Sequence, residues 1–106
     1  MDQKPKCYIV ENKKGHDLSG AAMFGDIVML YGGQPADIFM VSKHAHQIKK
    51  VLQSATEHDY LIISGNIILV LIAFAVLMER FGYVNVLLYD VRNAQYTPRV
   101  LAKHQI

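Results

Sequence analysis

The chain has 106 residues, of which 52% are hydrophobic and 19% charged, and this composition is typical of one globular domain rather than a disordered segment. The net charge of +2 is spread along the chain and is too weak to argue for binding of duplex nucleic acid, which we do not expect. A single cysteine, Cys7, excludes an internal disulfide framework and fits a reducing compartment such as the cytoplasm. We expect one domain over residues 1–106, with residues 1–5 frayed.

The first half of the chain predicts two strands and two helices. Residues 7–10 form an apolar strand, in which we expect Cys7 to be an inert core thiol rather than a nucleophile. Asp17 is placed to cap a short helix over residues 18–24, which Gly25 ends. A second apolar strand covers residues 27–31. Residues 37–55 then carry apolar side chains at a spacing of three to four, which predicts an amphipathic helix.

The second half predicts a strand over residues 60–63, a helix over 66–81 and a strand over 84–89, followed by a turn and a last, antiparallel strand over 95–101. Pro98 has no N–H to donate, so this last strand should lie at an edge. Apolar strands that alternate with helices predict an α/β fold, a three-layer sandwich with a mostly parallel sheet. Right-handed crossovers favour the strand order 2-1-3-4-5.

The helix over residues 66–81 is apolar on every side, which is unusual for a small domain. Its uninterrupted apolar run, residues 67–78, is shorter than the roughly 18–20 residues that span a bilayer, so we expect no membrane span. We assign Ile67, Leu71, Phe74, Met78 and Phe81 to the side that covers the sheet. The opposite side would form the interface of a homo-oligomer, most simply a dimer, through Leu69, Val70, Ala73, Val76 and Leu77. The alternative is that the preceding helix and the C-terminal segment cover this side within the monomer.

Polar residues follow the first and third strands, where open parallel sheets bind ligands. A helix start offers free backbone N–H groups and a partial positive charge, which suit a phosphate or carboxylate, and Gly65 lets a ligand approach the backbone. We therefore expect an anionic or nucleotide-like ligand at His16, Asp17, Ser19, Ser64, Gly65 and Asn66. The alternative is that Asp17 and Ser64 are only helix caps.

No motif in the chain names a reaction. The glycine patterns of phosphate-binding and dinucleotide-binding loops are absent from the sequence. His44 and His46 are two apart on a predicted helix and point away from each other, so they do not share a metal. We expect no catalytic residues, metal or cofactor, and favour a protein that is not an enzyme.

Two segments resemble a group of small bacteriophage α/β proteins. The first follows the pattern H-D-x-S-x-A-x-x-F-G at residues 16–25, and the second follows D-Y-[LI]-[LI]-x-[ST]-G at residues 59–65. The resemblance spans about residues 8–90 and carries no activity with it. It implies expression in the cytoplasm of an infected bacterium, where small phage proteins often act on host machinery or host defence.

Two hypotheses about function follow. The first is an oligomeric accessory protein without catalysis that binds an anionic or nucleotide-like molecule at the strand ends, for example to counter host defence. The second is a protein-interaction module that inhibits or redirects a host factor. A small enzyme is the third and weakest alternative.

Overall fold

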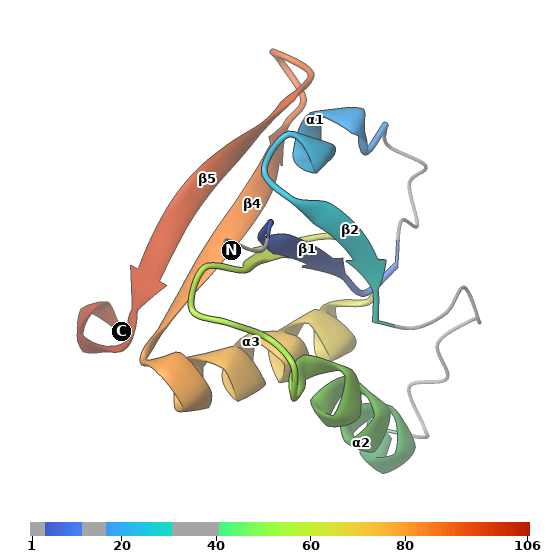
Figure 1. Cartoon of the computed structure of the whole chain (residues 1–106), viewed down its shortest axis with the longest axis vertical. Coiled ribbons are helices and arrows are strands. Elements are labelled where there is room, and N and C mark those ends of the chain that lie inside the picture. Colours follow the sequence, from blue (N-terminus) through green and yellow to red (C-terminus); the bar gives the residue numbers. More distant parts are fainter. Residues whose placement is uncertain (1–3, 12–16, 31–40) are drawn as a thin grey trace.

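The computed structural model describes residues 4–11, 17–30 and 41–106 (Figure 1). Its five strands form one sheet in the order β2-β1-β3-β4-β5, parallel except for the antiparallel pair β4–β5, which confirms the predicted topology. The strands are β1 (Lys6–Ile9), β2 (Asp26–Met29), β3 (Tyr60–Ile62), β4 (Tyr83–Asp90) and β5 (Gln95–Ala102). The helices are α1 (Ser19–Ala22), α2 (Val41–Leu52), α3 (Ile67–Phe81) and the short 3-10 helix η2 (Lys103–Gln105).

Several elements are shorter than predicted. Helix α1 spans four residues rather than the seven expected over 18–24, and α2 ends at Leu52 rather than at residue 55. The expected start of α2 at residue 37 lies outside the described residues, as does residue 31 of the second strand.

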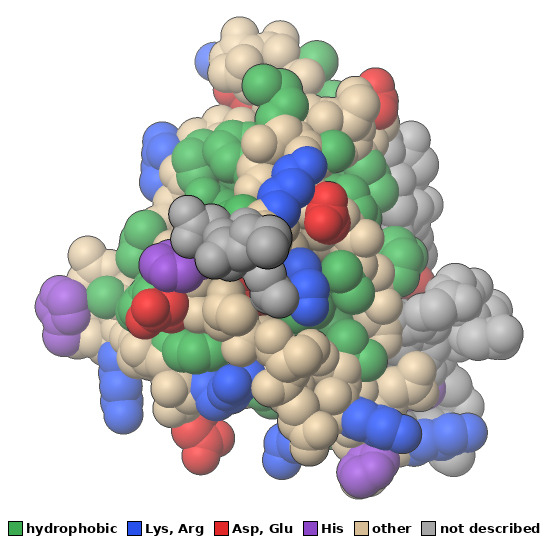
Figure 2. All heavy atoms as spheres, viewed as in Figure 1, with side chains coloured by type: hydrophobic (Ala, Val, Ile, Leu, Met, Phe, Trp, Pro, Cys, Tyr) green, Lys and Arg blue, Asp and Glu red, His purple; other side chains and the backbone are tan. Residues whose placement is uncertain are grey.

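The sheet has two different faces, because side chains alternate along each strand. Tyr8 and Val10 point to the face that α2 and α3 cover, where they join the larger core cluster. Cys7 and Ile9 point to the other face, where α1 is the one helix among the described residues. This short helix leaves much of the hairpin uncovered. Figure 2 shows hydrophobic side chains at the surface over β4 and β5, and Val100 of β5 is 58% exposed.

Helix α3 has well-defined ends. Asn66 is the N-cap, and its side chain accepts a hydrogen bond from the Ile68 N–H at 2.9 Å. At the other end Gly82 adopts a left-handed conformation with φ of 78° and donates its N–H to the Met78 carbonyl at 2.8 Å. Ser64, for which a helix cap was the alternative to ligand binding, lies two residues before the N-cap. No helix in the described part of the chain has the length and hydropathy of a membrane span.

Burial along α3 does not follow the two sides that we assigned, although Phe74, Met78 and Phe81 of the assigned sheet side are partly buried against the core. Four of the five expected interface residues are buried inside the monomer, namely Leu69, Val70, Ala73 and Leu77. The fifth, Val76, is partly buried against the same core. Ile67 and Leu71, expected on the sheet, are instead 63% and 58% exposed. Helix α2 packs beside α3, as the alternative required. Ile67 and Leu71 were assigned to the wrong side because an all-apolar helix carries no pattern that distinguishes its inner side from its outer side.

The outer edge of β5 is blocked against further strand pairing at Pro98 and at Ala102. Leu87 accepts a hydrogen bond from the Ile63 N–H at 3.1 Å, so its polar backbone groups point toward β3 and not toward β5. Its partner Pro98 therefore directs its backbone outward, at a position where the missing N–H costs no ladder bond. The Pro98 carbonyl accepts from the Arg99 guanidinium at 2.7 Å. The outward N–H of Ala102 is likewise used, since it donates to the Gln105 side chain at 2.9 Å. The predicted edge position of Pro98 is confirmed.

Candidate pocket at the carboxyl ends of strands β3 and β4

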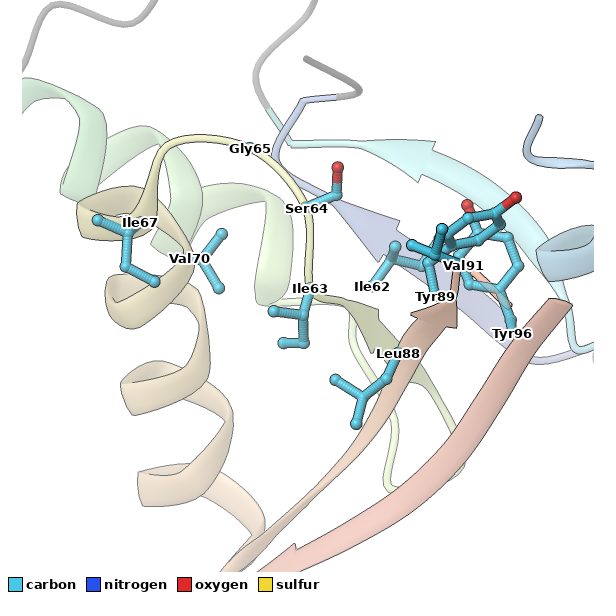
Figure 3. Close-up of a pocket in the computed structure, with 10 residues that line it drawn as sticks. All are labelled: Ile62, Ile63, Ser64, Gly65, Ile67, Val70, Leu88, Tyr89, Val91 and Tyr96. Carbon is cyan, nitrogen blue, oxygen red and sulfur yellow. The ribbon is translucent and has the colours of Figure 1, made fainter. Parts of the chain in front are cut away.

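A pocket of about 340 Å³ lies at the carboxyl ends of β3 and β4 (Figure 3). Its size is at the low end of the range for small-molecule sites. Three segments line it. The loop after β3 contributes Ser64 and Gly65, the first turn of α3 contributes Ile67 and Val70, and the far end of the hairpin contributes Leu88, Tyr89, Val91 and Tyr96. Ile62 and Ile63 complete the lining.

The walls of the pocket are mainly apolar, and its polar side chains carry hydroxyl groups. Ser64 supplies one hydroxyl, and Tyr89 and Tyr96 supply two more from one end of the pocket (Figure 3). Among the described residues that line it, none carries a charged side chain or an imidazole. Such a lining suits a ring-containing molecule with a few hydrogen-bonding groups.

Tyr96 is held in place from two sides. Its ring meets the ring of Tyr89 edge to face, with 5.2 Å between centroids, and Gly20 of α1 lies on its other side. A side chain at position 20 would place its Cβ at 3.4 Å from the Tyr96 ring, so α1 packs closely on it. Burial, then Tyr89 and Asp17, raises the pKa of Tyr96 above its ordinary value. Its hydroxyl therefore stays protonated at neutral pH and can donate a hydrogen bond.

The loop between β3 and α3 is fixed by Glu11, which follows β1. The Glu11 Oε1 accepts a hydrogen bond from the Asn66 N–H at 2.8 Å. Gly65 has φ of 110°, and a Cβ there would lie 2.5 Å from the Glu11 Cγ and 3.0 Å from the Glu11 carbonyl oxygen. Glycine is therefore required by both the backbone conformation and the close approach of the two chain segments. Two of the backbone donors that we expected to be free, those of Asn66 and Ile68, already have partners within the protein.

The predicted ligand-binding residues are only partly brought together. Ser64 and Gly65 line the pocket, whereas Asn66 is a helix cap beside it. Asp17 and Ser19 do not line it, and Asp17 instead accepts a hydrogen bond from the Ser19 N–H at 2.9 Å where α1 begins. The Ser19 N–H and then the Ser19 hydroxyl lower the pKa of Asp17. His16 lies outside the described residues. The structure does not make Asp17 the cap of α1, because the N-cap is Leu18 and has no side-chain cap hydrogen bond; Asp17 instead closes a local turn just before the helix.

Sequence reasoning missed the side chains at the far end of the pocket and the carboxylate behind it. Glu11 had a usable signal, because the predicted order already placed the first and third strands side by side, which sets the residue after one near the loop after the other. Tyr89 and Tyr96 are a register pair across the β4–β5 turn, whereas the predicted strand ends would have paired Tyr89 with Gln95. Nothing in the local sequence marked Leu88 or Val91 as pocket residues.

Cys7 lies away from the pocket, in the core. It is buried, and its Sγ lies 3.5 Å from the Ala21 carbonyl oxygen. Burial, with smaller effects of Asp59 and Asp26, raises the pKa of its thiol to about 11. The prediction that Cys7 is a buried core residue is confirmed. Among the described residues, no three His, Cys, Asp or Glu side chains converge in a way that could hold a metal ion.

Fold and pocket together define a small α/β protein with a doubly wound sheet and a largely apolar pocket at the strand carboxyl ends. The chain belongs to the family of phage Pam3 gp32-like proteins, whose pattern matches residues 5–103. This match confirms the expected phage origin. A search of curated proteins and a search of solved structures each gave no match.

Proposed function

We propose that this phage protein is an accessory protein that binds a small, ring-containing molecule in the pocket and does not transform it. The observation that carries the proposal is the pocket of about 340 Å³ at the strand carboxyl ends, lined by Ser64 and Gly65. The described lining offers hydroxyl groups but no histidine, carboxylate or lysine, the side chains that most often act as a general base, which favours binding over catalysis. In an infected bacterial cell, such a protein would sequester a small molecule, for example a signal of host defence.

The test is a binding panel of nucleosides, nucleotides and dinucleotides, followed by thermal denaturation and by native mass spectrometry, which also detects a ligand that co-purifies. The variant Ile67→Trp should fill the pocket, because Ile67 lines it and is largely exposed, so that the larger ring enters without disturbing the core. Leu71→Trp is the matched control, since Leu71 is similarly exposed one turn further along α3 but does not line the pocket. We expect a bound ligand to raise the melting temperature of the wild type and of Leu71→Trp but not that of Ile67→Trp. Equal stabilisation of wild type and Ile67→Trp would rule this pocket out.

A second candidate is a protein interface on the outer side of α3, and its support is the exposure of Ile67 and Leu71, one helical turn apart. Adjacent exposed apolar side chains on a helix are typical of a surface that another protein covers. We expect a second copy to bind here and form a two-fold dimer. The dimer would use the side of α3 opposite to the one predicted from sequence.

Leu71→Glu should convert such a dimer to a monomer in light-scattering measurements at high concentration. Val100→Glu on β5 is the control, because Val100 and Leu71 are both 58% exposed but lie on different elements. A wild-type protein that stays monomeric at high concentration would remove the dimer. Capture of a single host protein by the wild type, lost in Leu71→Glu, would favour the interaction module instead.

A further inference from the structure

We propose that Glu11 determines the specificity of the pocket by excluding anionic ligands, so that the pocket selects uncharged molecules. The inference rests on the proposed small-molecule site and names the class of ligand that the site accepts. It replaces the anionic ligand that we expected from the sequence with an uncharged one.

The position of Glu11 follows from the sheet topology. Strands β1 and β3 are parallel neighbours in which Ile9 pairs with Ile62, so the chain segments that leave them run side by side. Gly65 has no side chain, and this allows the Glu11 backbone and Cγ to lie against it. Gly65 also lines the pocket, so the Glu11 carboxylate lies one residue behind the pocket wall.

The carboxylate takes the place that an anion would use. An anion at a helix start binds the first free N–H groups, and here the Asn66 N–H donates to Glu11 at 2.8 Å and the Ile68 N–H to Asn66 at 2.9 Å. A phosphate at this end of α3 would have to displace a carboxylate that is already bound within the protein. Neither of these two donors is available without such a displacement.

Charge leads to the same conclusion as hydrogen bonding. The helix start contributes about half a positive charge, and a glutamate carboxylate contributes a full negative one at neutral pH. Among the described residues, Glu11 therefore outweighs the positive end of the α3 dipole. No lysine, arginine or histidine among the described lining residues offsets it. An anion bound beside Gly65 would lie about one residue from the Glu11 carboxylate. Repulsion between these two negative charges lowers the affinity of the pocket for the anion by about tenfold or more.

The first experiment uses inorganic phosphate and does not depend on the identity of the ligand. Amide signals of Gly65, Asn66 and Ile68 are followed by NMR as phosphate is added to the wild type and to Glu11→Gln. The glutamine keeps an oxygen that accepts the Asn66 N–H but removes the charge. We expect no saturable shift in the wild type and an affinity at least about tenfold higher in Glu11→Gln. Glu57→Gln, an exposed carboxylate before the other end of β3, should behave as the wild type.

Saturable phosphate binding by the wild type that Glu11→Gln does not strengthen would overturn the proposal. Equal absence of binding in both proteins would overturn it as well, because the carboxylate would then not be the excluding group.

The second experiment compares adenosine with adenosine monophosphate as a matched neutral and anionic pair. The wild type should bind adenosine at least about tenfold more tightly, and Glu11→Gln should narrow this ratio. A wild type that prefers the monophosphate contradicts the role of Glu11 but leaves the proposed pocket intact. Failure of the whole panel to bind removes the proposed function, and the phosphate titration then still decides the role of Glu11.

Discussion

The two ends of strand β3 use polar groups in opposite ways. At the amino end the buried Asp59 carboxylate accepts hydrogen bonds from the Lys6 N–H at 3.0 Å and from the Thr56 N–H at 2.8 Å, as well as from the Thr56 hydroxyl. At the carboxyl end Ser64 and Gly65 border an open pocket with apolar walls. Satisfied hydrogen bonds stabilise the first end, whereas side chains that carry hydroxyl groups line the pocket at the second end. The comparison places stability and binding at opposite ends of one strand.

The largest effect should come from breaking the amino end with Asp59→Ala. Two backbone N–H groups would lose a charged acceptor, and we expect the free energy of unfolding to fall by about 4 kcal/mol. Urea denaturation measures it. Glu57→Ala, an exposed change two residues earlier, should stay within about 0.5 kcal/mol of the wild type. A loss below about 1 kcal/mol in Asp59→Ala would show that the network does not fix this end.

At the carboxyl end, Gly65→Ala should cost about 2–3 kcal/mol, because the new Cβ meets Glu11 and the backbone is in a left-handed conformation. Gly82→Ala is the matched control. It also has positive φ, at 78°, but no atom lies within 4 Å of its added Cβ, so we expect about 1 kcal/mol from conformation alone. The difference between the two variants in thermal or urea denaturation isolates the contact with Glu11. Equal losses would contradict that contact.

Substitutions of two tyrosines test the comparison between the two ends of β3, and both should have small effects on stability. The Tyr83 hydroxyl donates to the Glu57 carbonyl at 2.8 Å near the amino end of β3, so Tyr83→Phe should lower the free energy of unfolding by about 0.5–1 kcal/mol. Tyr96→Phe should change it by less than about 0.3 kcal/mol but should weaken ligand binding. Stability from urea denaturation and affinity from the ligand panel test both statements. The comparison fails if Tyr96→Phe is the more destabilising change.

The smallest effect at neutral pH concerns Cys7, which lies in β1 opposite Tyr60. Its pKa is raised in the folded protein from an ordinary value of 9.0 to about 11. Its contribution to stability is therefore complete below pH 9 and is lost as the pH rises through 11. Iodoacetamide should not label the native protein at pH 8, and Cys7→Ala should show a shallower loss of stability between pH 9 and 11. Rapid native labelling at pH 8 would show that the thiol is accessible.

The strand order and the edge position of Pro98 could be predicted because they depend on features that a sequence carries. Apolar strands, short connections and the missing N–H of proline each restrict the topology by themselves. The inner side of α3 could not be predicted, since Leu69 and Leu71 are the same residue type and only the location of α2 separates them.

Only one loop of the candidate site, the loop after β3, was predicted from the sequence. Ser64 and Gly65 were found because ligands of parallel sheets bind beyond the strand carboxyl ends. The ligand's expected charge followed from a helix start considered alone. Glu11, 55 positions from Asn66 along the chain, makes a tertiary contact at this helix start that the local sequence does not reveal. The two tyrosines at the far end depend on the register of a hairpin, which a reading of separate segments does not supply.

The interruption of the β5 edge at Pro98 has a consequence for the association of one chain with another. Exposed strand edges are the usual starting points of amyloid-like growth, in which one chain after another adds a strand. Here the middle of the edge offers no donor at Pro98, and the acceptor beside it is occupied by Arg99. At Pro98, therefore, the edge disfavours the addition of a further strand.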